Sequence, residues 1–183
     1  MGKEIRFDYS KLRPMDMVVC AGKSPFATTT RIVTAGLRKA FDHSVSVHTG
    51  IIVDFHGQLL VAEMQSKGLE INSLHRYRKE GGRRWVIAFR RNPIYDDPAV
   101  REAAQQRIAR DRRKTIEYDF KGLMEFVFAK IDDNKKRNYC SEYFYMTTLE
   151  DGLRYPVSFK AKVSPYDLQL VGGGWTNVLG WNL

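Results

Sequence analysis

Three side chains in this sequence have the types that cysteine-based hydrolysis needs, namely Cys140, His48 and Glu63. A nucleophilic thiol requires a base that later protonates the leaving group, and histidine suits both tasks because its pKa lies near neutrality. A third group then fixes the tautomer of the imidazole ring and stabilises its charged form. These residues supply the three types if the fold brings them together.

Cys140 stands where a helix is expected to begin. The polar run 132–138 precedes it, and residues 143–149 show the apolar face of a helix. A cysteine in a first helical turn feels the partial positive charge of unpaired N–H groups, which lowers its pKa and offers donors to an oxyanion. The alternative is a small buried residue, because free cysteine is among the most buried types.

His48 and Glu63 are expected on one face of a β-hairpin. If His56-Gly57 occupies the turn centre, Glu63 lies opposite Gly50, and His48 is one diagonal step away on the same face. Gly50 has no side chain and leaves space for the carboxylate, whereas a register slip of one residue would separate the pair. The pattern predicts strands at 45–53 and 58–64 around a turn at 54–57.

The other histidines suit a catalytic role less well. His56 is expected at an exposed turn tip, His43 lies in a loop, and His75 has basic neighbours. The alternatives to a triad are that His48 is an ordinary strand histidine and that Glu63 faces solvent.

The remaining pattern predicts an α+β fold, in which an antiparallel sheet packs against helices. Cys20 is expected in the core, and the chain, residues 1–183, is expected to form one domain. The tail either closes over this domain or packs against a partner. The further expected elements are a turn and strand within 12–20, a helix from Ser24-Pro25 to near Ala40, strands at 68–71 and 85–89, a helix opened by Asp97-Pro98, a helix with Leu123 to Ile131, and a glycine-rich aromatic tail from 164 to 183.

Four segments, in chain order, resemble those of one known family. They are Pro14–Val19, which resembles P-G-D-[IV]-[VL], Ser44–Val53, which resembles S-H-[VT]-G-I-V, Val61–Glu63, which resembles [IV]-x-E, and Asn138–Glu142, which resembles N-x-x-Y-C-S-E-L. Together they resemble the circularly permuted NlpC-type, papain-like cysteine hydrolases of the YiiX/YebB-like group, of which lecithin retinol acyltransferase is a more distant relative. The similarity extends from about Lys11 to Asp167, with Met15 in place of a glycine and Val47 in place of the serine before the histidine.

The resemblance implies a papain-like core in which the histidine and the polar residue precede the cysteine in the chain. It implies that Cys140 is the nucleophile, His48 the general base and Glu63 the orienting residue. Tyr139 and Ser141, on either side of the nucleophile, are expected to contact substrate or to assist the oxyanion. The family's substrates are poorly defined, so the resemblance names none.

Composition excludes several classes of protein. The chain is 43% hydrophobic and 28% charged, which is typical of a globular protein, and it has no apolar run of about 20 residues that would span a membrane. Two cysteines are too few for a disulfide scaffold or a cysteine-rich zinc site, and no metal or cofactor is expected. No signal peptide is recognised, which predicts a cytoplasmic protein of a bacterium or a phage.

The net charge of +9 favours anionic partners, and the equal alternative is a solvated surface that keeps the protein soluble. The leading hypothesis is a peptidase or amidase that acts on a peptide or a cell-wall peptide. A second hypothesis uses the same triad on lipid esters, as an acyltransferase or phospholipase at an anionic surface. A third is a non-enzymatic module that binds anionic ligands, although no nucleic-acid motif interleaves with the arginines. The excess charge lies in Arg76, Arg78, Lys79, Arg83, Arg84, Arg90 and Arg91, in 107–114, and in 135–137.

Overall fold

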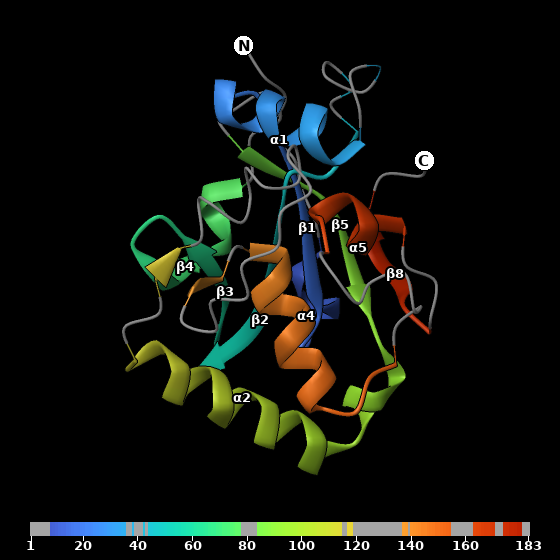
Figure 1. Cartoon of the computed structure of the whole chain (residues 1–183). Helices are drawn as coiled ribbons and strands as arrows, with labels where there is room; N and C mark the ends of the chain where they lie inside the picture. Colours follow the sequence, from blue (N-terminus) through green and yellow to red (C-terminus); the bar gives the residue numbers. More distant parts are fainter. Residues whose placement is uncertain are drawn as a thin grey trace.

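The computed structural model describes residues 8–35, 38, 42, 44–77, 84–114, 117–118, 137–138, 140–154, 163–170 and 174–180. Its main sheet consists of β1 (Met17–Gly22), β2 (His48–Phe55), β3 (Gln58–Gln65), β4 (Gly68–Ser73), β5 (Arg84–Arg91) and β8 (Thr176–Gly180). These strands lie in the order β4-β3-β2-β1-β5-β8, and every neighbouring pair is antiparallel (Figure 1). The central strand β1 is buried along its whole length.

Three of the described helices pack on one face of this sheet, and the first helix of the chain lies at one end of it (Figure 1). The helices are α1 (Pro25–Ala35), α2 (Pro98–Arg112), α4 (Cys140–Glu150) and α5 (Pro165–Leu170). In Figure 1, α4 crosses the front of the sheet over β2, with which it is in contact, and α2 lies below it. Short turns of 3-10 helix are η1 (Tyr9–Lys11), η3 (Leu74–Tyr77) and η4 (Pro93–Asp96), and β6 (Glu117–Tyr118) pairs in parallel with β7 (Arg137–Asn138).

Both faces of the sheet are buried. Side chains such as Met17 and Ile51 pack toward the helices, in one core with Phe144 of α4. Their neighbours in sequence, such as Val18 and Ile52, form a second core on the other face. Because successive residues of a strand point to opposite faces, a polar side chain on either face of β2 is removed from water.

The predicted hairpin is confirmed together with its register. Ile51 pairs with Ala62 and Phe55 with Gln58. His56 and Gly57 form the two-residue turn, with φ angles of 55° and 79°. Positive φ at both central residues is the geometry of a type I′ turn, whose twist matches that of the flanking strands.

One boundary of this hairpin was predicted wrongly, since the strand expected from Val45 begins at His48. Residues 45–47 are buried but do not form a regular ladder. The Val47 N–H donates to Cys20 O at 2.9 Å, and the Ser46 N–H donates to the side chain of Gln169 at 2.6 Å. The distant α5 therefore satisfies a backbone group that a longer strand would have paired.

The remaining predicted elements are largely present. Helix α1 opens at Ser24-Pro25, where the Ala27 N–H donates to Ser24 Oγ at 3.1 Å. Helix α2 opens at Asp97-Pro98, whose carboxylate accepts from the Ala99 N–H at 2.8 Å. Cys20 is buried, as expected. The predicted end of the first helix near residue 40 and the helix expected at 123–131 lie outside the described residues.

The tail closes over the sheet, which was one of its two predicted roles. It contributes α5 and β8, which the sequence did not predict, and β8 pairs with β5 at the edge of the sheet. Trp175 is buried, with its ring centroid 5.5 Å from that of Phe144. The tail thereby packs against the same helix that carries Cys140.

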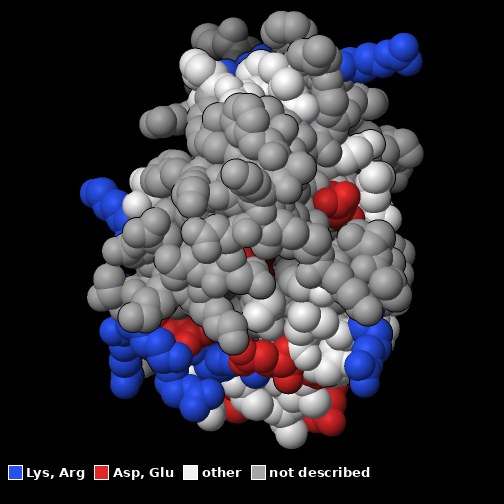
Figure 2. Space-filling view, in the orientation of Figure 1, with Lys and Arg blue, Asp and Glu red and all other residues white. Residues whose placement is uncertain are grey.

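Several arginines of the basic stretches hold the fold together. Arg91 forms two hydrogen bonds to Asp16, both of 2.8 Å. Arg90 donates to the backbone carbonyls of Leu168 and Gln169, and Arg107 pairs with Asp151. Other cations remain on the surface, and Figure 2 shows them gathered over the end of α2. The exposed residues there are Arg110, Arg112, Arg113 and Lys114.

Candidate active site

The Cys140 thiol and the His48 imidazole are in hydrogen-bond contact. Cys140 is the first residue of α4, and His48 is the first residue of β2, the strand on which α4 packs. The backbone N–H of Thr49 donates a further hydrogen bond to the Cys140 sulfur. Both side chains are nearly inaccessible, with 5% of Cys140 and 3% of His48 exposed. The thiol therefore lies in surroundings that contain little water.

The His48 ring also bonds Glu63, through its other nitrogen. Nε2 of His48 lies 2.5 Å from Oε2 of Glu63. Nδ1 is therefore the nitrogen that contacts the Cys140 thiol, because an imidazole has only two ring nitrogens. Gly50 permits this approach, since a Cβ there would lie 2.6 Å from a methyl group of Val61 and 3.4 Å from Cβ of Glu63. The diagonal placement predicted from the hairpin register is thus present.

Five donors surround the Glu63 carboxylate, which is only 1% exposed. Oε2 accepts from His48 and lies 3.3 Å from Nη1 of Arg84. Oε1 accepts from the remaining three donors, which are the amides of Gln65 at 2.6 Å and Asn72 at 2.9 Å, and the Tyr77 hydroxyl. Burial alone would raise the pKa of Glu63, but His48, Tyr77 and Arg84 together lower it from 4.5 to about 2. Glu63 is therefore a carboxylate at neutral pH.

The charges of the site favour a thiolate beside an imidazolium. Burial raises the pKa of Cys140, but His48, the Thr49 N–H and Arg84 outweigh burial, and the net pKa is lowered. Burial and Arg84 lower the pKa of His48, but Cys140 and Glu63 outweigh them, and the net pKa is raised. Each shift favours the charged form, so these surroundings make proton transfer from sulfur to imidazole easier than it would be between the same groups in water.

The second thiol contrasts with the first. Cys20 is 1% exposed and lies in the core of the sheet. Burial is the largest influence on it and raises its pKa. A buried thiol with a raised pKa is unreactive, so Cys20 provides an internal comparison for Cys140.

Tyr139 and Ser141 flank the nucleophile and were expected to contact substrate or to assist the oxyanion. Tyr139 lies outside the described residues. Ser141 is fully buried, and its hydroxyl donates to Val163 O at 2.6 Å, which gives that side chain a structural bond. Of the other histidines, His56 and His75 are exposed, and His43 lies outside the described residues.

Four contributors to the site were not predicted from sequence, namely Gln65, Asn72, Tyr77 and Arg84. Gln65 had a readable signal, because it lies two residues after Glu63 and so on the same face of β3. Tyr77 lies in η3 and Arg84 at the start of β5. Nothing local in the sequence connects those two residues with Glu63.

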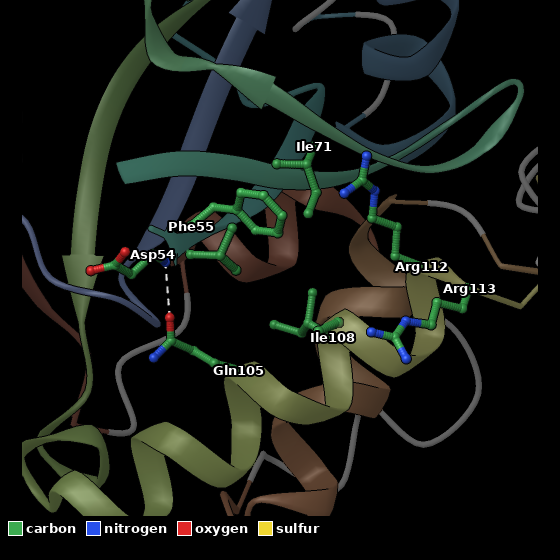
Figure 3. A pocket seen from close by; sticks show the side chains of 9 residues that line it. Asp54, Phe55, Ile71, Gln105, Ile108, Arg112 and Arg113 are labelled. Carbon is green, nitrogen blue, oxygen red and sulfur yellow. Dashed lines mark hydrogen bonds between the residues drawn. The ribbon is translucent and has the colours of Figure 1, made fainter. Parts of the chain in front are cut away.

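A pocket of about 240 Å³ lies elsewhere, between the β2–β4 sheet and α2. Figure 3 shows Phe55, Ile71 and Ile108 around it, with Arg112 and Arg113 to one side. Cys140, His48 and Glu63 do not line it. The pocket is therefore separate from the candidate active site.

The described residues hold no group of three or more His, Cys, Asp or Glu side chains arranged to bind a metal ion. No helix among them has the length and apolar character needed to cross a membrane.

The fold belongs to the α+β class, with a papain-like arrangement in which the strands bearing histidine and acid precede the helix bearing cysteine. The sequence itself matches no family model and no curated protein. Among solved structures, the crystal structure of the metalloprotein YiiX from Escherichia coli O157:H7 is similar, with a TM-score of 0.55 and 16% sequence identity over 77% of this chain and 67% of that one. The predicted fold class is confirmed, and the likeness to YiiX extends to the fold alone.

Proposed function

We propose that this protein is a cysteine hydrolase, and specifically a peptidase or amidase, with Cys140 as nucleophile, His48 as base and Glu63 as orienting acid. The observation that carries the proposal is the continuous hydrogen-bonded chain from thiol to imidazole to carboxylate, with all three side chains buried. One hydrogen-bond partner would be enough to stabilise a buried neutral histidine in the fold. A histidine between a thiol and a carboxylate has the geometry that nucleophilic catalysis requires.

In the first half of the reaction, the Cys140 thiolate attacks the carbonyl carbon of the substrate. A sulfur–carbon bond forms, and the carbonyl oxygen becomes an oxyanion. The first N–H groups of α4 have no acceptor within the helix and are suited to hold that oxygen. The His48 imidazolium then gives its proton to the leaving nitrogen, the carbon–nitrogen bond breaks, and an acyl thioester remains on Cys140.

In the second half, neutral His48 takes a proton from water, and the resulting hydroxide attacks the thioester. The acid product leaves, and the proton on His48 restores the thiolate–imidazolium pair. Glu63 keeps its charge throughout, because its pKa of about 2 lies far below neutrality. Its task is to stabilise the imidazolium and to hold Nε2, so that Nδ1 stays directed at the sulfur.

The decisive experiment measures thiol reactivity. The protein is treated with iodoacetamide at pH 6, and the modified cysteine is located by peptide mapping. We expect rapid labelling of Cys140, no labelling of folded Cys20, and no labelling at all in Cys140→Ala. Labelling of Cys20 in preference to Cys140 in the folded protein would overturn the assignment.

Substrate chemistry is then tested with matched p-nitroanilides and p-nitrophenyl esters of the same acyl groups. We expect a burst of about one chromophore per protein with esters, an acyl adduct on Cys140 by mass spectrometry, and turnover of amides. Turnover confined to long-chain esters on anionic vesicles would instead favour the lipid-ester reaction with the same triad. Absence of any adduct with either series would count against a covalent mechanism.

A further inference from the structure

Arg84 is a cation beside the proposed catalytic pair whose position the hydrolytic mechanism does not require. It is the first residue of β5 and pairs with Gly22 of β1, two residues beyond the rung where Cys20 faces His48. Its Nη1 lies 3.3 Å from Oε2 of Glu63, the oxygen that bonds His48. The guanidinium is thereby held next to the imidazole.

Arg84 is not needed to satisfy the hydrogen bonds of Glu63. Oε1 already accepts from three donors, and Oε2 already accepts from His48. Without Arg84 both oxygens would remain hydrogen-bonded, so the carboxylate would not be left unsatisfied. Arg84 helps to lower the pKa of Glu63, but His48 and Tyr77 lower it more. Hydrogen bonding of the buried acid therefore does not by itself explain why an arginine lies there.

The charge of Arg84 also acts against part of the catalytic pair. A cation at this position disfavours the imidazolium form of His48, on which the leaving group depends. It does favour the thiolate, but His48 and the Thr49 N–H already do so more strongly. A positive charge with a mixed effect on the nucleophile and its base suggests that its main partner is the substrate.

Most of the guanidinium remains available for such a partner. It has five N–H donors, and within the described part of the chain its one bonded side chain is Glu63. The Arg84 side chain is 31% exposed, whereas the Glu63 side chain is inaccessible. The Arg84 side chain is therefore partly accessible to solvent beside a carboxylate that is not. A planar fork of donors matches a carboxylate well, since it can bind both oxygens at once.

We propose that Arg84 makes this site selective for acyl substrates that carry a carboxylate within a few bonds of the carbonyl under attack. The inference rests on the proposed function, because it assumes that Cys140 is the attacking group. Arg84 is then a specificity-determining residue. It anchors the anionic end of the substrate while its bond to Glu63 fixes the anchor relative to His48 and the sulfur.

Two alkylating reagents of nearly equal size test this directly. Iodoacetate and iodoacetamide both form a sulfur–carbon bond to the thiolate and release iodide, but only iodoacetate carries a carboxylate beside the reacting carbon. The measured quantity is the ratio of their rate constants at Cys140, divided by the same ratio for a small free thiol. We expect this normalised ratio to be about ten. A tenfold rate preference lies between the preferences that a close charge pair would give in water and in protein.

Three variants separate the local charge from the overall charge. Arg84→Gln should reduce the ratio about tenfold. Arg84→Lys, which keeps the charge but lacks the planar fork, should keep only part of the preference. Arg110→Gln removes one exposed arginine from α2 and should leave the ratio unchanged. An equal loss in Arg84→Gln and Arg110→Gln would overturn the proposal, since it would show only the field of a basic protein.

The outcomes distinguish this inference from the function on which it rests. No reaction of Cys140 with iodoacetamide would remove the proposed function itself. Reaction with iodoacetamide, but a ratio that Arg84→Gln leaves unchanged, would remove only the carboxylate site. If Arg84→Gln does not fold, the wild-type ratio is measured at about 500 mM salt, where the field of the exposed cations is screened but a close, partly buried charge pair is screened much less. A ratio near one at this salt concentration would refute the inference.

Discussion

Acidification provides the sharpest quantitative test of the site, because it acts on the buried carboxylate of Glu63. The pKa of this group falls from 4.5 to about 2 in the folded protein. Each pKa unit corresponds to about 1.4 kcal/mol, so the ionised form contributes about 3 kcal/mol to folding at neutral pH. Glu63 is only 1% exposed, so solvent screening does not reduce this figure much.

The sign of the pH effect follows from the direction of the shift. A carboxyl group whose pKa is lowered by folding stabilises the native state above its unfolded pKa of about 4.5, and this contribution disappears as the pH falls toward 2. Between pH 5 and pH 3 about 2 kcal/mol of it should be lost. The physical cause is that the Glu63 carboxyl binds a proton in the unfolded chain over this pH range but stays ionised in the folded protein.

The assay is a carboxyl-carbon NMR titration of protein labelled at glutamate, followed until the onset of acid unfolding. Glu63→Gln assigns the resonance by its disappearance. Glu70→Gln is the matched control, because Glu70 lies opposite Glu63 on β4 and is only partly buried. We expect the Glu63 signal to remain that of a carboxylate down to about pH 3. A protonation midpoint above 4 in the folded state would refute the reasoning about its five donors.

Three further predictions concern the same buried site. Gly50→Ala should destabilise folding by about 1–3 kcal/mol in urea titrations, because its Cβ would meet a methyl group of Val61 at 2.6 Å. Tyr77→Phe removes one donor from Glu63 and should cost about 1.5–3 kcal/mol by the same measurement, with a smaller loss of kcat than Glu63→Gln. The pH profile of kcat/KM should be bell-shaped. Its acid limb should follow the lowered pKa of the Cys140 thiol, and its alkaline limb the raised pKa of the imidazole.

The hairpin could be predicted from sequence because its determinants are local. The turn at His56-Gly57 fixes which residues face each other, and strand alternation then places His48 and Glu63 on one face. The start of Cys140's helix was also local, since a polar run ends where apolar periodicity begins. Contact between the thiol and the imidazole, by contrast, depended on the packing of α4 against β2, for which the family resemblance was the only guide.

The elements and partners that were missed depend on contacts between distant parts of the chain. The tail contains no strong strand pattern, and β8 forms because β5 offers it an open edge. Tyr77 and Arg84 reach Glu63 only once β4, η3 and β5 have taken their places around the sheet. The net charge could not show which cations are available to a partner. Arg90 donates to a backbone carbonyl and Arg91 to the Asp16 carboxylate, so both belong to the fold itself.

The provision of five donors for one carboxylate favours a functional interpretation of Glu63 over a purely structural one. Removing an ionised group from water costs several kcal/mol, and apolar side chains of similar volume often serve stability equally well. A network that keeps the pKa of Glu63 near 2 has a clearer consequence for its neighbour. It fixes a negative charge 2.5 Å from His48 Nε2, and that charge, together with Cys140, raises the pKa of the imidazole against the effect of burial. The five donors of Glu63 thus lie where the charged form of a histidine beside a thiol depends on them.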